Sequence, residues 1–163
     1  MLEESSLGLQ FCLVPSRGAR ICQIVAGQTQ QFLGFAERLD RGARHWRWAA
    51  YPILAVHEAE DEPLLFTIHR LWGWRSTLEV RDADGLRVGT IRLGFVWDRH
   101  GNGLAGLVSG TDGTQFRGAG GEELGTLRQE TDGLLLSFAP VLDSDPFAKM
   151  LLLAAALTVG SLQ

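Results

Sequence analysis

The chain of 163 residues has little cysteine, almost no lysine and no excess of positive charge. Cys12 and Cys22 are its only cysteines, which excludes a disulfide framework and favours two reduced, half-buried thiols. Lys149 is the only lysine among 15 basic residues, and 19 acidic residues give a net charge of −4. This balance argues against broad electrostatic attraction to nucleic acid, so we expect no nucleic-acid partner.

The N-terminal segment lacks the features of a secretory signal. Residues 1–10 carry Glu3 and Glu4 where a signal peptide has basic residues ahead of an apolar run. We therefore expect a cytoplasmic protein.

What the sequence does have is a short, uniformly apolar segment close to its C-terminal end. From Met150 to Val159 every side chain is apolar except Thr158, so a helix here has no polar face to turn toward water. These ten residues are about half of the roughly 20 that span a bilayer, which favours a helix buried in a protein core. The flanking residues suit helix ends: N-cap candidates at Asp143, Ser144 and Asp145, Pro146 at the first helical position, and Gly160 at the end.

The residues before this segment carry the pattern of antiparallel β-strands. Twenty glycines and repeated turn signals separate short runs of β-branched, leucine and aromatic residues. The clearest unit is 64–92, where Asp82-Ala83-Asp84-Gly85 predicts a hairpin turn, because aspartate suits turn positions and Gly85 supplies a positive φ. We predict a mainly β fold in one domain covering 1–163, in which antiparallel strands over residues 8–140 surround a helix over 146–159; that these strands close into a barrel is what the family resemblance described below implies.

Two stretches interleave arginine with tryptophan. Tryptophan favours the headgroup level of a membrane and arginine binds lipid phosphates, so both stretches are candidates for a lipid or partner surface. The alternative interpretation is a solvated loop whose tryptophans pack against the barrel or close its end. The candidate surface comprises Arg41, Arg44, Trp46, Arg47 and Trp48 in the first stretch and Arg70, Trp72, Trp74 and Arg75 in the second.

No motif has the spacing of a catalytic or metal site. The acidic stretch 57–62 favours a solvated turn over a cation site. Residues 101–106 match G-x-G-x-x-G, but further glycines interrupt the helix that a dinucleotide site needs. Ser109 lacks the preceding glycine of a nucleophile elbow, and His69 alternates with apolar residues as a residue of the barrel wall does. We predict no catalytic residue, no cofactor and no metal.

Two segments of the chain follow a recognisable family pattern. Residues 63–92 contain a strand, a bend and a strand ending in D-A-D-G-x-x-V-G-x-I, and residues 23–37 look like a degraded copy of this unit. Residues 142–159, LDSDPFAKMLLLAAALTV, contain L-D-x-D followed by an apolar helix. Both segments resemble the phospholipid scramblase and LURP-one-related family. The resemblance implies a Tubby-like architecture, a closed antiparallel barrel of about twelve strands around a C-terminal helix.

The resemblance implies a lipid-, phosphoinositide- or partner-binding module. Calcium-responsive scramblases carry a carboxylate-rich segment before the closing helix, whereas here apolar residues alternate between Asp132 and Asp143 and indicate a strand. We therefore expect a non-enzymatic barrel that binds anionic membrane lipid, an apolar ligand or a protein partner, peripherally at a membrane. Transbilayer lipid movement is the alternative function, and a hydrolase whose site is unreadable from residue order is a third.

Overall fold

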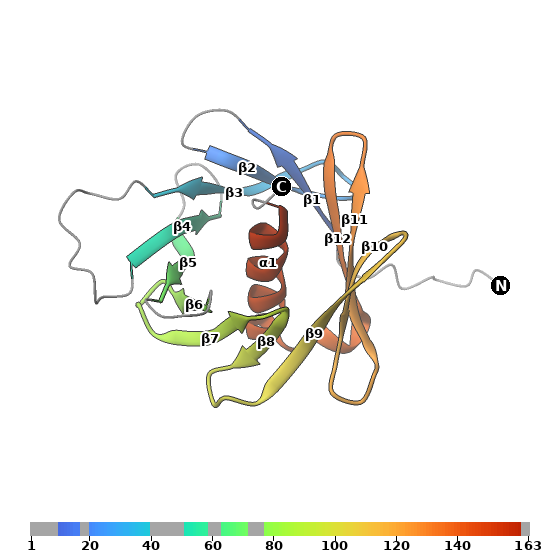
Figure 1. Ribbon diagram of the computed structural model, residues 1–163. Helices are drawn as coiled ribbons and strands as arrows, with labels where there is room; N and C mark the ends of the chain where they lie inside the picture. Colours follow the sequence, from blue (N-terminus) through green and yellow to red (C-terminus); the bar gives the residue numbers. More distant parts are fainter. Residues whose placement is uncertain (1–9, 17–19, 40–50, 59–62, 72–76, 161–163) are drawn as a thin grey trace.

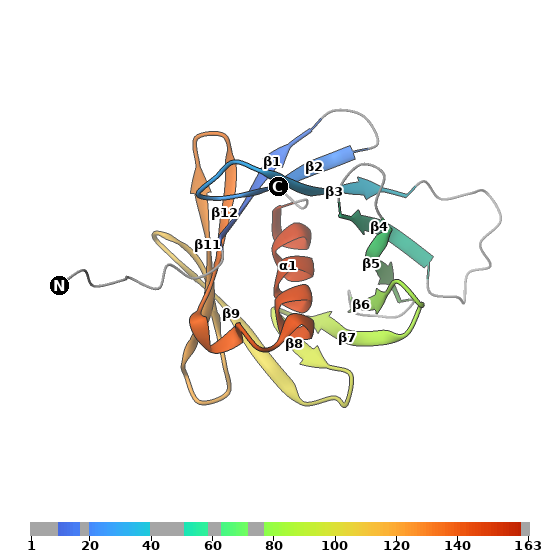
Figure 2. The ribbon, with the colours of Figure 1, turned by 180° about the vertical axis from the view of Figure 1, so that it is seen from behind.

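The computed structural model describes residues 10–16, 20–39, 51–58, 63–71 and 77–160. Its strands form one closed barrel in which each strand is antiparallel to the next and β12 pairs with β1 (Figures 1 and 2). The strands are β1 (Gln10–Pro15), β2 (Arg20–Ala26), β3 (Phe32–Arg38), β4 (Tyr51–His57), β5 (Leu64–Arg70), β6 (Thr77–Asp82), β7 (Arg87–Arg92), β8 (Phe95–Asp98), β9 (Gly103–Gly110), β10 (Gly113–Arg117), β11 (Glu123–Glu130) and β12 (Gly133–Phe138). Closure gives every strand a partner on both sides.

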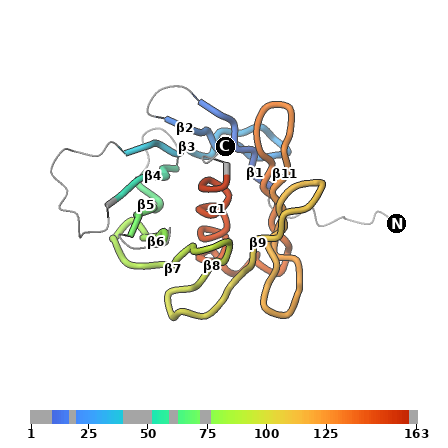
Figure 3. Tube along the Cα trace, viewed as in Figure 1, coloured from blue at the N-terminus to red at the C-terminus, as the bar shows by residue number. Residues whose placement is uncertain are grey.

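An α-helix, α1 (Pro146–Gly160), runs through the centre of the barrel (Figures 1 and 3). It follows β12 and a short 3₁₀ turn, η1 (Pro140–Leu142), and the Asp145 carboxylate caps its start by accepting a hydrogen bond from the Ala148 N–H at 2.9 Å. Its side chains are buried around the whole circumference: Ala148, Leu151, Leu152, Leu153, Ala154, Ala155, Ala156, Leu157 and Thr158.

The barrel wall supplies the other half of the core. Alternate residues of each strand face inward, as Phe66 and Ile68 do on β5, and pack with the helix in one hydrophobic cluster. At Gly89 on β7 an added Cβ would lie 2.9 Å from Leu151 Cδ2, so glycine is needed where this strand passes the helix. The architecture confirms the predicted fold class: mainly β, a closed antiparallel barrel enclosing a C-terminal helix.

The predicted turns and the rejected motif agree with the structure. Gly85 has φ +78°, and Asp82 Oδ1 accepts hydrogen bonds from the backbone N–H groups of Asp84 and Leu86 at 3.1 and 2.8 Å. The 101–106 match to a dinucleotide fingerprint lies in a turn and the first half of β9, so no helix begins there.

The barrel has two ends because successive strands run in opposite directions. We name the end where α1 starts the entry end; β6 and β8 finish there, close to Asp145 and Phe147. We name the end where α1 finishes the mouth; β1, β3, β5, β7, β9 and β11 finish there, and Ala156 and Leu157 of the helix lie beside Pro15 and Gly133.

Candidate ligand-binding site at the barrel mouth

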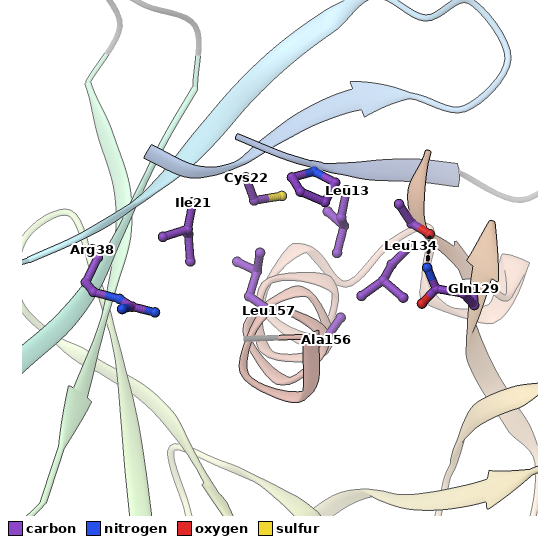
Figure 4. A pocket seen from close by; sticks show the side chains of 10 residues that line it. Leu13, Ile21, Cys22, Arg38, Gln129, Leu134, Ala156 and Leu157 are labelled. Carbon is purple, nitrogen blue, oxygen red and sulfur yellow. Dashed lines mark hydrogen bonds between the residues drawn. The ribbon is translucent and has the colours of Figure 1, made fainter. Parts of the chain in front are cut away.

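A pocket of about 310 Å³ opens at the mouth, between the last turns of α1 and the strands β1, β2 and β12 (Figure 4). Its lining is mainly apolar: Leu13, Pro15, Ile21, Cys22, Gly133, Leu134, Ala156 and Leu157. Two polar side chains border it, Arg38 and Gln129. An apolar cavity of a few hundred Å³ with few polar groups has the character of a small-molecule site.

The pocket arises from strand register and from the sequence of the helix. Leu13 pairs with Ile24 on β2 and with Leu134 on β12, which places large apolar side chains around one part of the mouth. On α1, Ala156 lies one turn after Leu152 on the same helix face. Because the alanine side chain is a single methyl group, the helix leaves space at the mouth that Leu152 fills deeper in the barrel.

Arg38 brings a positive charge to this pocket. It is the last residue of β3, and strand alternation puts it on the same face as Gly34 and Ala36, which face the barrel interior. Figure 4 shows its side chain extending over the pocket toward the helix. Within the described residues the Arg38 side chain forms no hydrogen bond or ion pair.

Arg70 occupies the equivalent place on β5. It is the last residue of that strand and lies on the same face as the buried Phe66 and Ile68. Its Nε is buried and has no hydrogen-bond partner among the described residues. A buried donor without an acceptor costs about 1–3 kcal/mol, and more when the group is charged. An anionic ligand would supply the missing acceptor.

Three alternate strands of the mouth finish in arginine. These residues, Arg38 on β3, Arg70 on β5 and Arg92 on β7, form what we name the basic arc. One strand separates each arginine from the next, so neighbouring Cα atoms lie about 10 Å apart or slightly more. The arc ends at β9, which finishes in Gly110 and is followed by Asp112.

The remaining polar groups at the pocket are held by the chain itself. Gln129 Nε2 donates to the Gly133 carbonyl at 3.1 Å, which fixes that side chain at the pocket edge (Figure 4). Burial, and then the neighbouring Cys12, raise the pKa of the Cys22 thiol to about 12. Cys22 therefore stays protonated and contributes an apolar surface rather than a nucleophile. Both cysteines are free, and they are not cross-strand partners: Cys12 pairs with Val25 and Cys22 with Pro15.

Of the predicted surface residues, the structure describes Arg70. The others, Arg41, Arg44, Trp46, Arg47, Trp48, Trp72, Trp74 and Arg75, lie outside the described residues. The strands that flank their two segments are β3 and β4 for the first and β5 and β6 for the second. All four present their adjoining ends at the mouth, beside the basic arc.

A hydrogen bond between Thr67 and His69 lies away from the mouth pocket. His69 Nε2 lies 2.9 Å from Thr67 Oγ1, and both residues alternate with the inward-facing Phe66 and Ile68. Burial, followed by the charge of Arg81, lowers the pKa of His69. The Glu79 carboxylate, which sits on the paired strand, is bound by Arg81 at 2.6 Å. Neither Thr67 nor His69 lines the pocket at the mouth.

Two further observations on the described residues concern metal ligands and membrane-spanning helices. His57 Nε2 is 3.2 Å from Glu37 Oε1 and the imidazole stacks on Phe35, so it is engaged within the wall. Among the described residues no group of three His, Cys, Asp or Glu side chains is arranged to hold a metal ion. In the part of the chain that the structure describes, no helix is both long and apolar enough to cross a bilayer.

Comparison of the chain with protein-family models, with curated proteins and with solved structures gives no match. The function is therefore inferred from the geometry of the mouth.

Proposed function

We propose that this protein is a non-enzymatic barrel that binds an anionic amphiphile, a membrane lipid, at its mouth. The carrying observation is the buried Nε of Arg70, which has no partner among the described residues, at the same end of the barrel as an apolar pocket bordered by Arg38. The phosphate of a lipid headgroup would accept hydrogen bonds from these guanidinium groups. The apolar pocket would receive part of the lipid that water solvates poorly.

The proposal includes membership of the phospholipid scramblase and LURP-one-related proteins and a peripheral, cytoplasmic position at a membrane. A closed barrel around a C-terminal helix is the architecture that this resemblance implies, which supports the proposal. The arginine- and tryptophan-rich segments at 41–48 and 72–75 would add headgroup contacts at the same end, since their flanking strands end at the mouth.

Binding rather than transbilayer movement fits the packing of the helix. Movement of lipids by a membrane-spanning α1 would require the helix to leave the barrel. Its four buried leucines and alanines would then lose their core, at about 1.5–3 kcal/mol for each large side chain.

Vesicle flotation tests the headgroup part of the proposal. We expect wild-type protein to float with phosphatidylcholine vesicles that contain phosphatidylserine or a phosphoinositide, and to stay behind with phosphatidylcholine alone. The variant Arg38→Glu/Arg70→Glu should bind the anionic vesicles at least about tenfold more weakly, since each basic residue at such a surface contributes about 1 kcal/mol. The matched control is Arg99→Glu/Arg117→Glu, which makes the same change of net charge at two exposed sites of the entry end. Equal flotation of the two double variants would contradict the proposal.

Titration calorimetry with monomeric dodecyl phosphate tests the pocket separately. Leu134→Trp enlarges a half-buried side chain that lines the pocket, and we expect it to weaken this binding while the protein keeps its thermal stability to within a few degrees. Unchanged binding by Leu134→Trp would place the ligand elsewhere on the barrel.

A further inference from the structure

A two-residue turn at the mouth carries a leucine in a backbone conformation that leucine rarely adopts. β7 and β8 are joined by Leu93 and Gly94 alone, and Arg92 pairs with Phe95 across the turn. Leu93 has φ +52° and Gly94 has φ +77°. Positive φ at both central residues is the requirement of a type I′ turn, where asparagine, aspartate and glycine are strongly preferred. A strained non-glycine residue of this kind motivates a search for its function.

Leu93 also begins a strip of exposed apolar side chains. Its exposed fraction is 62%, and along β8 and β9 it is followed by Phe95 at 54%, Trp97 at 37% and Val108 at 48%. The rings of Phe95 and Trp97 lie 6.4 Å apart between centroids. We name Leu93, Phe95, Trp97 and Val108 the apolar strip.

The aromatic rings lie over glycines of the neighbouring strand. A Cβ on Gly106 would lie 3.3 Å from the Phe95 ring, which is tight, and one on Gly103 would lie 3.6 Å from the Trp97 ring, which is an ordinary contact. The two rings therefore cover backbone on the outer side of the barrel, where they face away from the core around α1. The strip is a built feature of the outer surface and contributes little to the core.

Charge next to the strip indicates what it contacts. Arg92 is exposed, directly precedes Leu93, and forms no ion pair or side-chain hydrogen bond with the described residues. It belongs to the basic arc, so Arg92, Leu93 and Phe95 lie together at the mouth, and Trp97 lies further along β8. This combination complements an anionic bilayer: an apolar tip among acyl chains, aromatic rings at headgroup level and arginine on phosphate.

We propose that the β7–β8 hairpin is a membrane-insertion element. Leu93 enters the outer acyl region of an anionic bilayer, Phe95 and Trp97 lie at its headgroup level, and Arg92 binds lipid phosphate. The inference rests on the proposed function in that the mouth faces the membrane, but it names a contact outside the pocket.

The variant Leu93→Asn separates insertion from folding. Asparagine suits the positive φ of the turn, so we expect a melting temperature equal to or above that of the wild type. Loss of the apolar tip should lower partitioning into phosphatidylcholine–phosphatidylserine vesicles by about tenfold, the effect of burying one leucine side chain. Leu86→Asn is the matched control, since Leu86 is 66% exposed in the β6–β7 turn of the entry end, and it should leave partitioning unchanged.

The outcomes distinguish this inference from the proposed function and from other occupants. Equal partitioning of Leu93→Asn and Leu86→Asn would overturn the insertion element. A wild-type oligomer that Leu93→Asn converts to a monomer, with no change in partitioning, would also overturn it, because the strip would then bind a second copy. Dodecyl phosphate binding should persist in Leu93→Asn; if it persists while the wild type does not partition into any vesicle, insertion fails and the pocket proposal stands.

Discussion

Charged residues terminate strands at both ends of the barrel, yet the two ends use them differently. At the entry end, Asp98 finishes β8 and its Oδ1 accepts the backbone N–H groups of His100 and Asn102, both at 2.8 Å. Asp82 finishes β6 and binds its own turn in the same way. At the mouth, the arginines of the basic arc make no such contacts with described residues. Asp82 and Asp98 therefore stabilise their own turns at the entry end, whereas the basic arc, which has no such partner among the described residues, is the part that we assign to the proposed ligand.

The cavities at the two ends follow the same contrast. A cavity of about 400 Å³ at the entry end is larger than the mouth pocket and is bordered by Asp82, Asp98 and Asp145. Each of these carboxylates accepts hydrogen bonds from its own backbone neighbourhood, so none needs a ligand. Cavity size alone would favour the entry end as the candidate ligand site. The arginines that have no partner among the described residues favour the mouth instead.

The largest expected effect comes from the helix that both ends share. Leu152 is fully buried in α1, and Leu152→Ala should lower the free energy of unfolding by about 2–5 kcal/mol. Because the helix packs against strands all around the barrel, we expect one cooperative transition in urea, with entry-end and mouth amides losing hydrogen-exchange protection together. Two separated transitions would show that the two ends unfold as independent units and would contradict the expectation that they share one core. Leu86→Ala, at an exposed site, should change stability little.

A smaller effect of opposite sign is expected from Arg70→Met. Methionine keeps an unbranched side chain of similar length and removes the buried Nε that has no described partner. We expect the free energy of unfolding to rise by about 1 kcal/mol while binding to anionic vesicles weakens. Arg92→Met, at an exposed arginine of the same arc, should weaken vesicle binding without stabilising the fold. A loss of stability in Arg70→Met would show that Arg70 stabilises the fold, as Asp82 and Asp98 do.

Sequence patterns predicted the helix and the antiparallel strands because their signals are local, whereas closure of the strands into a barrel was expected from the family resemblance. Uniform apolarity from Met150 to Val159, with Asp145 before it and Gly160 after it, predicted a buried helix over 146–159, and α1 spans Pro146–Gly160. The glycine-rich region from Gly94 to Gly121 has no clear alternation of polar and apolar residues from which strand register could be predicted. It forms β8, β9 and β10, whose outer faces carry Phe95, Trp97 and Val108, so the alternation of polar and apolar residues is lost.

The pocket could not be predicted from the order of residues. Its walls join Leu13 on β1 with Leu157 at the end of the helix, and their proximity depends on closure of the barrel. The order of residues also does not show that Arg38 faces the pocket, because the inward direction of its side chain depends on where β3 ends. Leu93 gave no turn signal, since leucine is disfavoured at the positive φ that it adopts.

The smallest expected effect concerns the pH dependence of the entry end. The backbone N–H of Asn102, then its side-chain amide, and to a lesser degree the N–H of His100, hold the pKa of Asp98 below its usual value. A carboxyl group whose pKa is depressed by folding adds stability above its unfolded pKa of about 4 and loses that contribution as the pH falls through its folded pKa. We therefore expect the melting temperature of wild type to exceed that of Asp98→Asn at neutral pH, and the gap to close as the pH falls below about 4. Vesicle binding by Asp98→Asn at neutral pH should equal that of the wild type, because this carboxylate serves its own turn. A difference in melting temperature that does not change with pH, or a loss of vesicle binding, would contradict the assignment of structural charges to the entry end and ligand-binding charges to the mouth.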